Sequence, residues 1–223
     1  MNSWDFSIIP KFFTSFAPFA WMTIQVTVLG LLIGIVLGLL FSLLRISKLK
    51  ILNYPAKAYI WLIRGTPLLL QLLFIYFGLV NIVKLERLPA ACIALGVHNG
   101  AYIAEIFRGS IQSVSRGQRE AGMSIGMTQT KIMRRIILPQ AFKRAVPPLG
   151  NQFIIALKDS SLASAISVPE LLLHARQLGA SNFRLMEMLT IAAIYYLFMT
   201  SILTLISTLV ERKLKVSDNK STI

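Results

Sequence analysis

Long stretches without a single charged residue constrain this chain more than any other feature of its sequence. Four of them hold between 17 and 24 residues each: 21–44, 67–83, 88–104 and 190–210. A helix needs about 20 consecutive apolar residues to cross the hydrocarbon core of a bilayer. Hydrophobic residues make up 55% of the 223 and charged residues only 14%, which is too apolar for a soluble domain. The sequence therefore predicts an all-α integral membrane protein.

A fifth apolar segment, 145–168, carries Lys158 and Asp159 near its middle. Ionisable residues inside a membrane are rare and mark a functional site by default. We therefore expect about five transmembrane helices in one domain, 20–211. In chain order the segment 145–168 is the fourth of them, and Pro147-Pro148 is expected to begin it. An amphipathic lead-in at the outer interface, 1–19, precedes the domain, and a cytoplasmic tail, 212–223, follows it. The first span lacks an Ala-x-Ala cleavage pattern, so we interpret it as a retained anchor.

The basic residues are distributed unevenly between the segments that join these spans. If the N-terminus lies outside, the cytoplasmic segments hold 17 of the 23 Lys and Arg residues. This asymmetry follows the positive-inside rule and places the C-terminus in the cytoplasm. It explains the net charge of +14 without a nucleic-acid partner. A membrane enzyme is disfavoured as well, since the sequence has one Cys, two distant His residues and no nucleophile or metal-ligand motif.

Glycine and proline predict where helices pack closely and where one of them breaks. Gly30, Gly34 and Gly38 lie on one face of the first span, which favours close approach of another helix. Ordinary glycine enrichment of membrane helices is the alternative. The motif Arg64-Gly65-Thr66-Pro67 predicts a kink or a fresh helix start near the inner surface, because proline disfavours helix at the residue before it. Arg64 is expected to reach the lipid headgroups there.

Two of the predicted spans carry a polar stripe that should not face lipid. His98, Tyr102 and Glu105 recur at helical spacing on one face of the third span. Gln152 and Asp159 lie seven residues apart on one side of the fourth. These stripes either line a polar pathway or are neutralised locally, with Asp159 paired to Lys158 or a neighbour and Glu105 to Arg108.

A polar and basic segment, 115–139, interrupts the apolar sequence. Ser115-x-x-Gln118 fits a capping box and predicts a short helix to about Ser124. Gly126 is free to turn, and Thr128 begins a second helix that runs to about Ile137 and is limited by Pro139. The small residues Ala121 and Gly122 leave room for the groove of another protein, beside the charge of Glu120. A basic amphipathic helix lying on anionic headgroups is the alternative.

This segment resembles the signature of a known family. It is similar to the Glu-Ala-Ala motif of permease subunits of ABC importers. The matching pattern is Glu120-Ala121-Gly122, three residues, Gly126, nine residues and then Ile136-Ile137-Leu138-Pro139. Other short matches resemble the polar-amino-acid uptake branch: Arg64-Gly65-Thr66-Pro67, Ala101-Tyr102-Ile103-Ala104-Glu105 with Arg108, Gly117-Gln118, Leu138-Pro139-Gln140-Ala141, Pro147-Pro148 and Lys158-Asp159-Ser160-Ser161-Leu162. The resemblance spans about residues 20–211, and Gly122 departs from the second Ala of the motif.

The resemblance implies the transmembrane domain of a type I ABC importer, working as a homodimer or heterodimer in a bacterial inner membrane. A cytoplasmic ATPase dimer and an extracytoplasmic solute-binding protein are the implied partners, besides membrane lipid. The chain has no phosphate-binding loop, so ATP and Mg are expected in the partner, and this subunit is not an enzyme. The coupling loop, residues 111–140, would seat the following residues on the ATPase: Glu120, Ala121, Gly122, Gly126, Ile136, Leu138 and Pro139.

The implied substrate is a polar amino acid, such as cystine or a basic amino acid, moved by alternating access. Its ammonium and carboxylate need polar partners within the membrane. We expect the pathway to be lined by Glu105 and Asp159, with His98, Asn99, Tyr102, Gln152, Ser160 and Ser161 assisting. A permease of the same class for another small polar solute is the first alternative. A channel or membrane anchor with a basic surface loop is the second.

Overall fold

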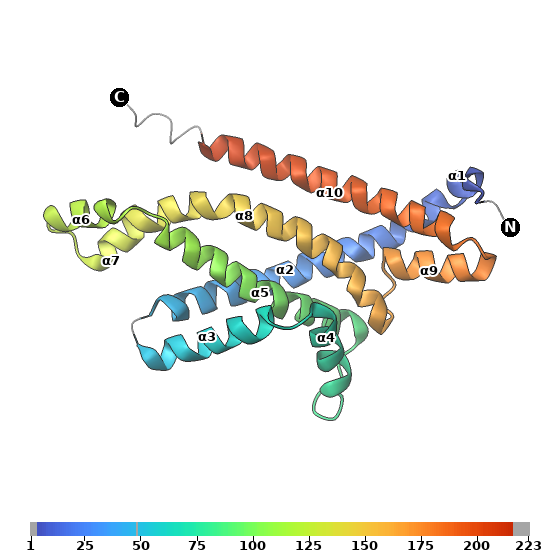
Figure 1. The fold of residues 1–223 in the computed structure, drawn as a ribbon, viewed down its shortest axis with the longest axis horizontal. Coiled ribbons are helices and arrows are strands. Elements are labelled where there is room, and N and C mark those ends of the chain that lie inside the picture. The colour runs from blue at the N-terminus through green and yellow to red at the C-terminus, as the bar shows by residue number, and fades with distance from the viewer. Residues whose placement is uncertain (1–3, 48, 216–223) are drawn as a thin grey trace.

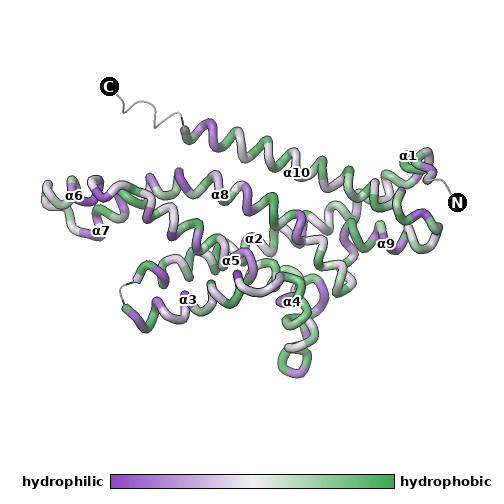
Figure 2. The backbone as a smooth tube through the Cα atoms, in the orientation of Figure 1, coloured by the Kyte–Doolittle hydropathy of each residue, from purple (hydrophilic) through white to green (hydrophobic). Residues whose placement is uncertain are grey.

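The computed structural model describes residues 4–47 and 49–215, and within these ranges the regular elements are all helices. Helices α2, α3, α5, α8 and α10 run along the long axis of the molecule (Figure 1). Helices α6 and α7 lie at one end, and α1 and α9 lie at the other. Figure 2 shows extended hydrophobic stretches on α2 and α10 and many hydrophilic residues in α6 and α7. The predicted all-α membrane architecture is confirmed.

Three helical stretches of the described chain are long and apolar enough to cross a membrane: Phe6–Ile46, Arg87–Gln112 and Leu185–Leu214. A fourth candidate is the pair Lys50–Arg64 and Leu68–Gly78, which is bent by 107°. The break falls at the predicted Arg64-Gly65-Thr66-Pro67 motif. The remaining long helix, α8 (Leu138–Asp159), carries basic residues and the prolines of the fourth predicted span. Length and apolarity alone therefore do not identify it as a membrane span.

The first stretch is assembled from η1 (Phe6–Ile8), α1 (Ile9–Phe13), η2 (Thr14–Phe16) and α2 (Ala17–Ile46). The predicted lead-in, 1–19, therefore continues into the first span as helix, and residues 1–3 lie outside the described chain. Of the predicted tail, 212–223, residues 216–223 also lie outside it. Asp5 caps the beginning by accepting from the hydroxyl of Ser7 and, at 3.1 Å, from its backbone N–H, and these two hydrogen bonds lower the pKa of Asp5.

The glycine stripe of α2 packs against α5 (Arg87–Gln112), as its spacing predicts. A methyl carbon added at Gly38 would lie 2.5 Å from Ile103 Cγ2, and one at Gly30 would lie 2.8 Å from Leu95 Cδ2. Contacts this short are excluded sterically, so only glycine lets the two backbones approach this closely. The close-packing prediction is confirmed, and this pair forms the centre of the fold.

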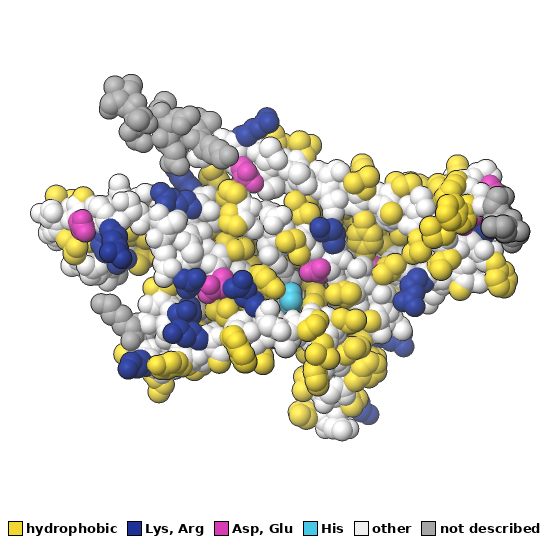
Figure 3. Space-filling view, in the orientation of Figure 1, with side chains coloured by type: hydrophobic (Ala, Val, Ile, Leu, Met, Phe, Trp, Pro, Cys, Tyr) yellow, Lys and Arg dark blue, Asp and Glu magenta, His cyan; other side chains and the backbone are white. Residues whose placement is uncertain are grey.

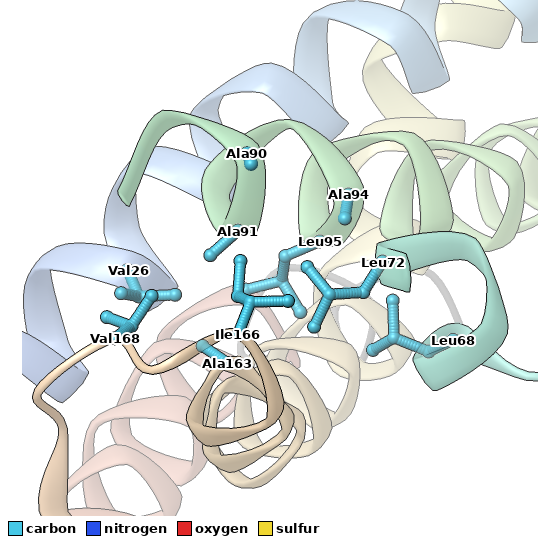
Figure 4. Packing of buried hydrophobic residues seen from close by; sticks show 10 residues of the cluster. All are labelled: Val26, Leu68, Leu72, Ala90, Ala91, Ala94, Leu95, Ala163, Ile166 and Val168. Carbon is cyan, nitrogen blue, oxygen red and sulfur yellow. The ribbon is translucent and has the colours of Figure 1, made fainter. Parts of the chain in front are cut away.

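The expected uninterrupted span over 67–83 is wrong. Helix α4 (Leu68–Leu73) continues only through a π-helical turn, η3 (Phe74–Gly78), and then ends. Figure 1 shows α4 projecting sideways from the long helices. Leu68 and Leu72 pack into a core with Val26, Leu95 and Ile166, which Figure 4 shows in close view. The apolar run itself does not encode these contacts with other helices, which bury α4 beside α2, α5 and η5 (Ser160–Ile166).

Two predictions about proline are also wrong. Pro139 does not limit the preceding helix, because α7 (Gln129–Ile132) continues through η4 (Met133–Ile137) directly into α8. Pro139 occupies the first turn of α8, where its missing N–H is tolerated. Pro147 and Pro148 do not open this helix but lie inside it. Packing of α8 against both α5 and α10 stabilises the helix across its two missing N–H donors.

At the opposite end, η5 (Ser160–Ile166) extends α8 and leads to α9 (Leu171–Asn182) and α10 (Leu185–Lys215). Glu170 is fully buried at this corner and accepts from the N–H groups of Leu172 and Leu173 and from the hydroxyl of Tyr196 at 2.8 Å. Burial raises the pKa of Glu170, while these donors oppose the rise. The sequence analysis did not single out this carboxylate, which fixes α9 to α10.

Candidate functional sites

The coupling loop folds into two short helices at one end of the molecule (Figure 1). Helix α6 (Arg116–Ser124) begins after Ser115, whose side chain accepts from Gly117 N at 3.3 Å. Gly126 adopts a φ of +76°, and Thr128 caps α7 by accepting from Lys131 N at 3.4 Å. These predictions are confirmed. The other half of the predicted capping box differs, since Gln118 Oε1 accepts from the side chain of Gln140 at 3.4 Å.

The structure places Gly122 inside the loop, facing away from solvent. Gly122 is buried, and an added methyl carbon would lie 2.8 Å from Ile132 Cγ1 and 3.2 Å from Ile136 Cδ1. Its small size lets α6 pack on the following helical segment. This corrects the expectation that Gly122 leaves room for a partner's groove. The solvent-facing residues of the predicted set are Glu120, Ala121, Gly126, Leu138 and Pro139, while Ile136 is half-buried.

Ile125 is a surface residue of the loop that the sequence analysis missed. Its side chain is 76% exposed beside Gly126, whereas Ile132 and Ile137 of the same segment are buried. The neighbouring Met123 is 45% exposed. Arg144 of α8 holds the base of the loop by donating to the backbone carbonyl and hydroxyl of Ser113. The loop therefore presents an exposed tip on a base that is fixed to a long helix.

A polar face runs along α5, and it brings together three of the predicted pathway residues. His98 lies with its ring centroid 5.1 Å from that of Tyr102, and the guanidinium of Arg64 lies 5.2 Å from the Tyr102 ring. Glu105 is one turn further, bonded to Arg108 at 2.6 Å and 4.0 Å from Arg64. In Figure 3, acidic, basic and histidine side chains form a band between hydrophobic regions on this side of the molecule.

Gln71 of α4 belongs to this polar face and was missed. Its Oε1 lies 3.1 Å from His98 Nδ1, and its Nε2 donates to the carbonyl of Ile63 at 2.8 Å and to Thr66 Oγ1 at 2.8 Å. The same side chain therefore supports the bend after α3 (Lys50–Arg64) and orients the histidine. A detectable signal existed, because Gln71 is the only polar residue in the first half of the uncharged run 67–83.

Asn99 and Gln152 form a separate pair. Gln152 Nε2 donates to Asn99 Oδ1 at 2.8 Å, and Asn99 Nδ2 donates to the carbonyl of Leu95 at 2.8 Å. Both side chains are buried, with Asn99 fully so. The pair joins α5 to α8 through satisfied hydrogen bonds, which gives both residues a role in helix packing, and their place in the pathway stays a prediction.

Asp159 is half-buried at the end of α8 in apolar surroundings. It lines a small cavity together with Leu68 and Leu72 of α4 and Ala91 and Ala94 of α5. The two serines that follow use their hydroxyls on the backbone, since Ser160 donates to Leu157 O and Ser161 to Lys158 O, both at 2.7 Å. Asp159 is thus the carboxylate that lines this cavity between α8, α4 and α5.

Comparison with known proteins identifies the family. The model of the binding-protein-dependent transport system inner membrane component matches residues 30–216. The glutamine transport system permease protein GlnP of Escherichia coli (strain K12) is 42% identical over 198 residues, covering 87% of this chain and 90% of that protein. The L-cystine transport system permease protein TcyB of Bacillus subtilis (strain 168) is 45% identical over 195 residues, covering 86% and 83%.

A solved structure agrees with these relatives. The crystal structure of an amino acid ABC transporter with histidines superposes with a TM-score of 0.90 at 39% identity, covering 96% of this chain and all of that one. The resemblance to ABC importer permeases therefore extends over nearly the whole chain, beyond its short motifs. This chain belongs to the family of binding-protein-dependent transport system inner membrane components, as a permease subunit.

Proposed function

We propose that this chain is the translocation subunit of an importer for a polar amino acid. The observation that carries the proposal is the polar face of α5, which places His98, Tyr102 and Glu105 inside an otherwise apolar bundle. The relatives named for glutamine and cystine transport, and the solved transporter with histidines, share a substrate class with an ammonium, a carboxylate and a polar side chain. Asp159 receives the ammonium in this proposal, because its surroundings are apolar.

The coupling loop docks on a separate ATPase in this account. Its exposed tip, with Glu120, Ala121 and Ile125, enters a groove of that partner, and ATP and Mg are bound there. The N-terminus lies outside and the C-terminus inside, as the distribution of basic residues indicates. A second permease subunit, identical or homologous, completes the pathway, and a solute-binding protein delivers the substrate from outside.

The energy for alternating access is supplied through the coupling loop, because substrate binding alone shifts the equilibrium between the two access states too little. A ligand shifts a two-state equilibrium only by its differential affinity for the two states. Closure of the ATPase dimer brings the coupling loops together, and the contact of Arg144 with Ser113 transmits this movement from the loop to α8. The carboxylate on α8 then changes its access from one side of the membrane to the other.

Reconstitution tests the proposed activity. The permease is placed in liposomes with the ATPase and solute-binding protein encoded beside it, and ATP-driven uptake of glutamine, cystine and arginine is measured against a sugar of similar size. We expect uptake of at least one of the amino acids and none of the sugar. Uptake of the sugar alone would assign the chain to the alternative, a permease for another small solute.

Docking is tested with one substitution on the coupling loop and one away from it. Glu120→Lys reverses the charge of the exposed tip and should abolish co-purification of the ATPase. Glu86→Lys makes the same charge reversal at an exposed site at the opposite end of α5 and should leave co-purification intact. If Glu120→Lys instead retains the ATPase and strengthens salt-sensitive binding to anionic vesicles, the loop is a lipid-surface element and not a docking element.

A further inference from the structure

A cavity of about 730 Å³ lies where α2, α3 and α5 meet. We call it the basic pocket and define it by the following lining residues: Arg45, Tyr54, Lys57, Trp61, Arg64 and Glu105. Four of these come from one face of α3, where they recur at intervals of three and four residues. Asn53 fixes the corner between the helices by donating to the carbonyl of Arg45, while Arg45 Nη1 lies 3.5 Å from Asn53 Oδ1.

The charges around this cavity do not balance. Three cations face a single carboxylate, Glu105, and that carboxylate is already held by Arg108 at 2.6 Å on its own helix. Lys57 Nζ lies 5.6 Å from the centre of the Tyr54 ring, a contact that leaves its charge uncompensated. Arg45 donates to a neutral amide. The excess of positive charge in a formed cavity favours an anionic ligand that bears more than one acceptor oxygen.

The pocket also lies at the level of a membrane surface. Arg45 is the first charged residue after the long uncharged run of α2, so it marks where the apolar span ends. Trp61 is 77% exposed and Tyr54 is 60% exposed on the adjoining face of α3. Tryptophan and tyrosine concentrate at membrane–water interfaces, and basic pockets between helices on the cytoplasmic side bind anionic lipid headgroups.

We propose that the basic pocket binds the phosphate headgroup of an anionic phospholipid of the inner leaflet. Arg45 and Lys57 contact the phosphate oxygens, and Tyr54 and Trp61 flank the glycerol region. The bound lipid joins the α2–α3 corner to the helix that carries Glu105 and the polar face. The proposal rests on the orientation given under the proposed function, which makes this end cytoplasmic.

Lipid retention tests the proposal without requiring transport. The permease, purified with its ATPase, is delipidated and placed in nanodiscs that contain phosphatidylglycerol and phosphatidylcholine, and the lipid retained after extraction is measured by native mass spectrometry. We expect wild-type protein to retain phosphatidylglycerol selectively. The double variant Arg45→Gln/Lys57→Gln should retain it about thirtyfold more weakly, since each basic residue near an anionic surface contributes about a factor of five.

Two matched variants separate the pocket from general charge and from misfolding. Lys50→Gln removes a cation from the same helix outside the pocket and should keep full selectivity. Arg45→Lys/Lys57→Arg preserves both charges and should also keep it. Equal retention by wild type and the double glutamine variant would overturn the proposal, as would an equal loss in Lys50→Gln.

A substrate role for the pocket would appear differently. If a saturating polar amino acid displaces the retained phosphatidylglycerol, the cavity belongs to the substrate route, and the lipid proposal is overturned. Because retention is measured on the resting complex, a permease that carries another solute would still show selective lipid binding. Failure of the lipid proposal and failure of the proposed transport function are therefore distinguishable.

Discussion

The two carboxylates of the predicted pathway occupy opposite environments. Glu105, at the end of α5 nearer the coupling loop, is bonded to Arg108 at 2.6 Å and lies 4.0 Å from Arg64. Asp159, at the far end of α8, lines an apolar cavity beside Leu68 and Ala94. A carboxylate with two cationic partners holds structure together, whereas one in apolar surroundings gains most from an incoming cation. On this difference we base the proposal that Asp159 contacts the substrate and Glu105 attaches the helices to each other.

The largest effect should come from neutralising the apolar-lined carboxylate. Asp159→Asn keeps the size of the side chain but removes the charge that attracts an ammonium. We expect ATP-driven uptake to fall about tenfold to a hundredfold, because a hydrogen bond to a charged group contributes about 1.5–3 kcal/mol. Basal ATPase activity should persist. Normal uptake in this variant would break the comparison.

A smaller effect on uptake is expected for Glu105→Gln. This variant leaves Arg108 and Arg64 without their shared partner, so its main consequence should be a lower thermal midpoint of the purified complex. Because the ion pair is partly exposed, we expect a loss of about 1 kcal/mol. A double-mutant cycle with Arg108→Gln isolates the pair. An uptake defect as severe as that of Asp159→Asn, with unchanged stability, would reverse the two assignments.

The weakest perturbation lies between the two carboxylates, at the contact of Gln71 with His98. Gln71→Leu removes the partner of His98 Nδ1 while retaining a buried side chain of similar size. We expect a loss of about 1 kcal/mol in stability and a modest fall in uptake. Gln177→Leu, on α9 away from the polar face, serves as the control. If Gln71→Leu exceeds Asp159→Asn in its effect on uptake, the bend after α3 controls access more than the carboxylate does.

The sequence predicts the features of this fold that depend on local patterns. Three of the four uncharged runs identify the long helices α2, α5 and α10. The glycine stripe identifies the face of α2 that packs on α5, and Gly126 and Thr128 mark the turn of the coupling loop. Each of these depends on residues within a few turns of one another. The bend at Arg64-Gly65-Thr66-Pro67 is local in the same sense, because proline acts on the residue before it.

The errors arise where contacts between distant segments decide the outcome. Pro147 and Pro148 remove backbone donors locally, but packing against α5 and α10 keeps α8 helical. Gly122 faces inward because Ile132, ten residues later, folds back onto it. Asn99 and Gln152 satisfy each other across 53 positions of the chain. Periodicity places a polar residue on a face of its helix but does not identify what covers that face.

The central claim, that Asp159 receives the ammonium of the substrate, is tested most directly by binding measurements on the permease in nanodiscs. The affinity for the transported amino acid is compared with the affinity for its α-hydroxy analogue, which lacks the ammonium, in wild type and in Asp159→Asn. We predict that the substitution weakens binding of the amino acid at least tenfold and leaves binding of the analogue unchanged. Equal weakening of both ligands, or of neither, would contradict the account.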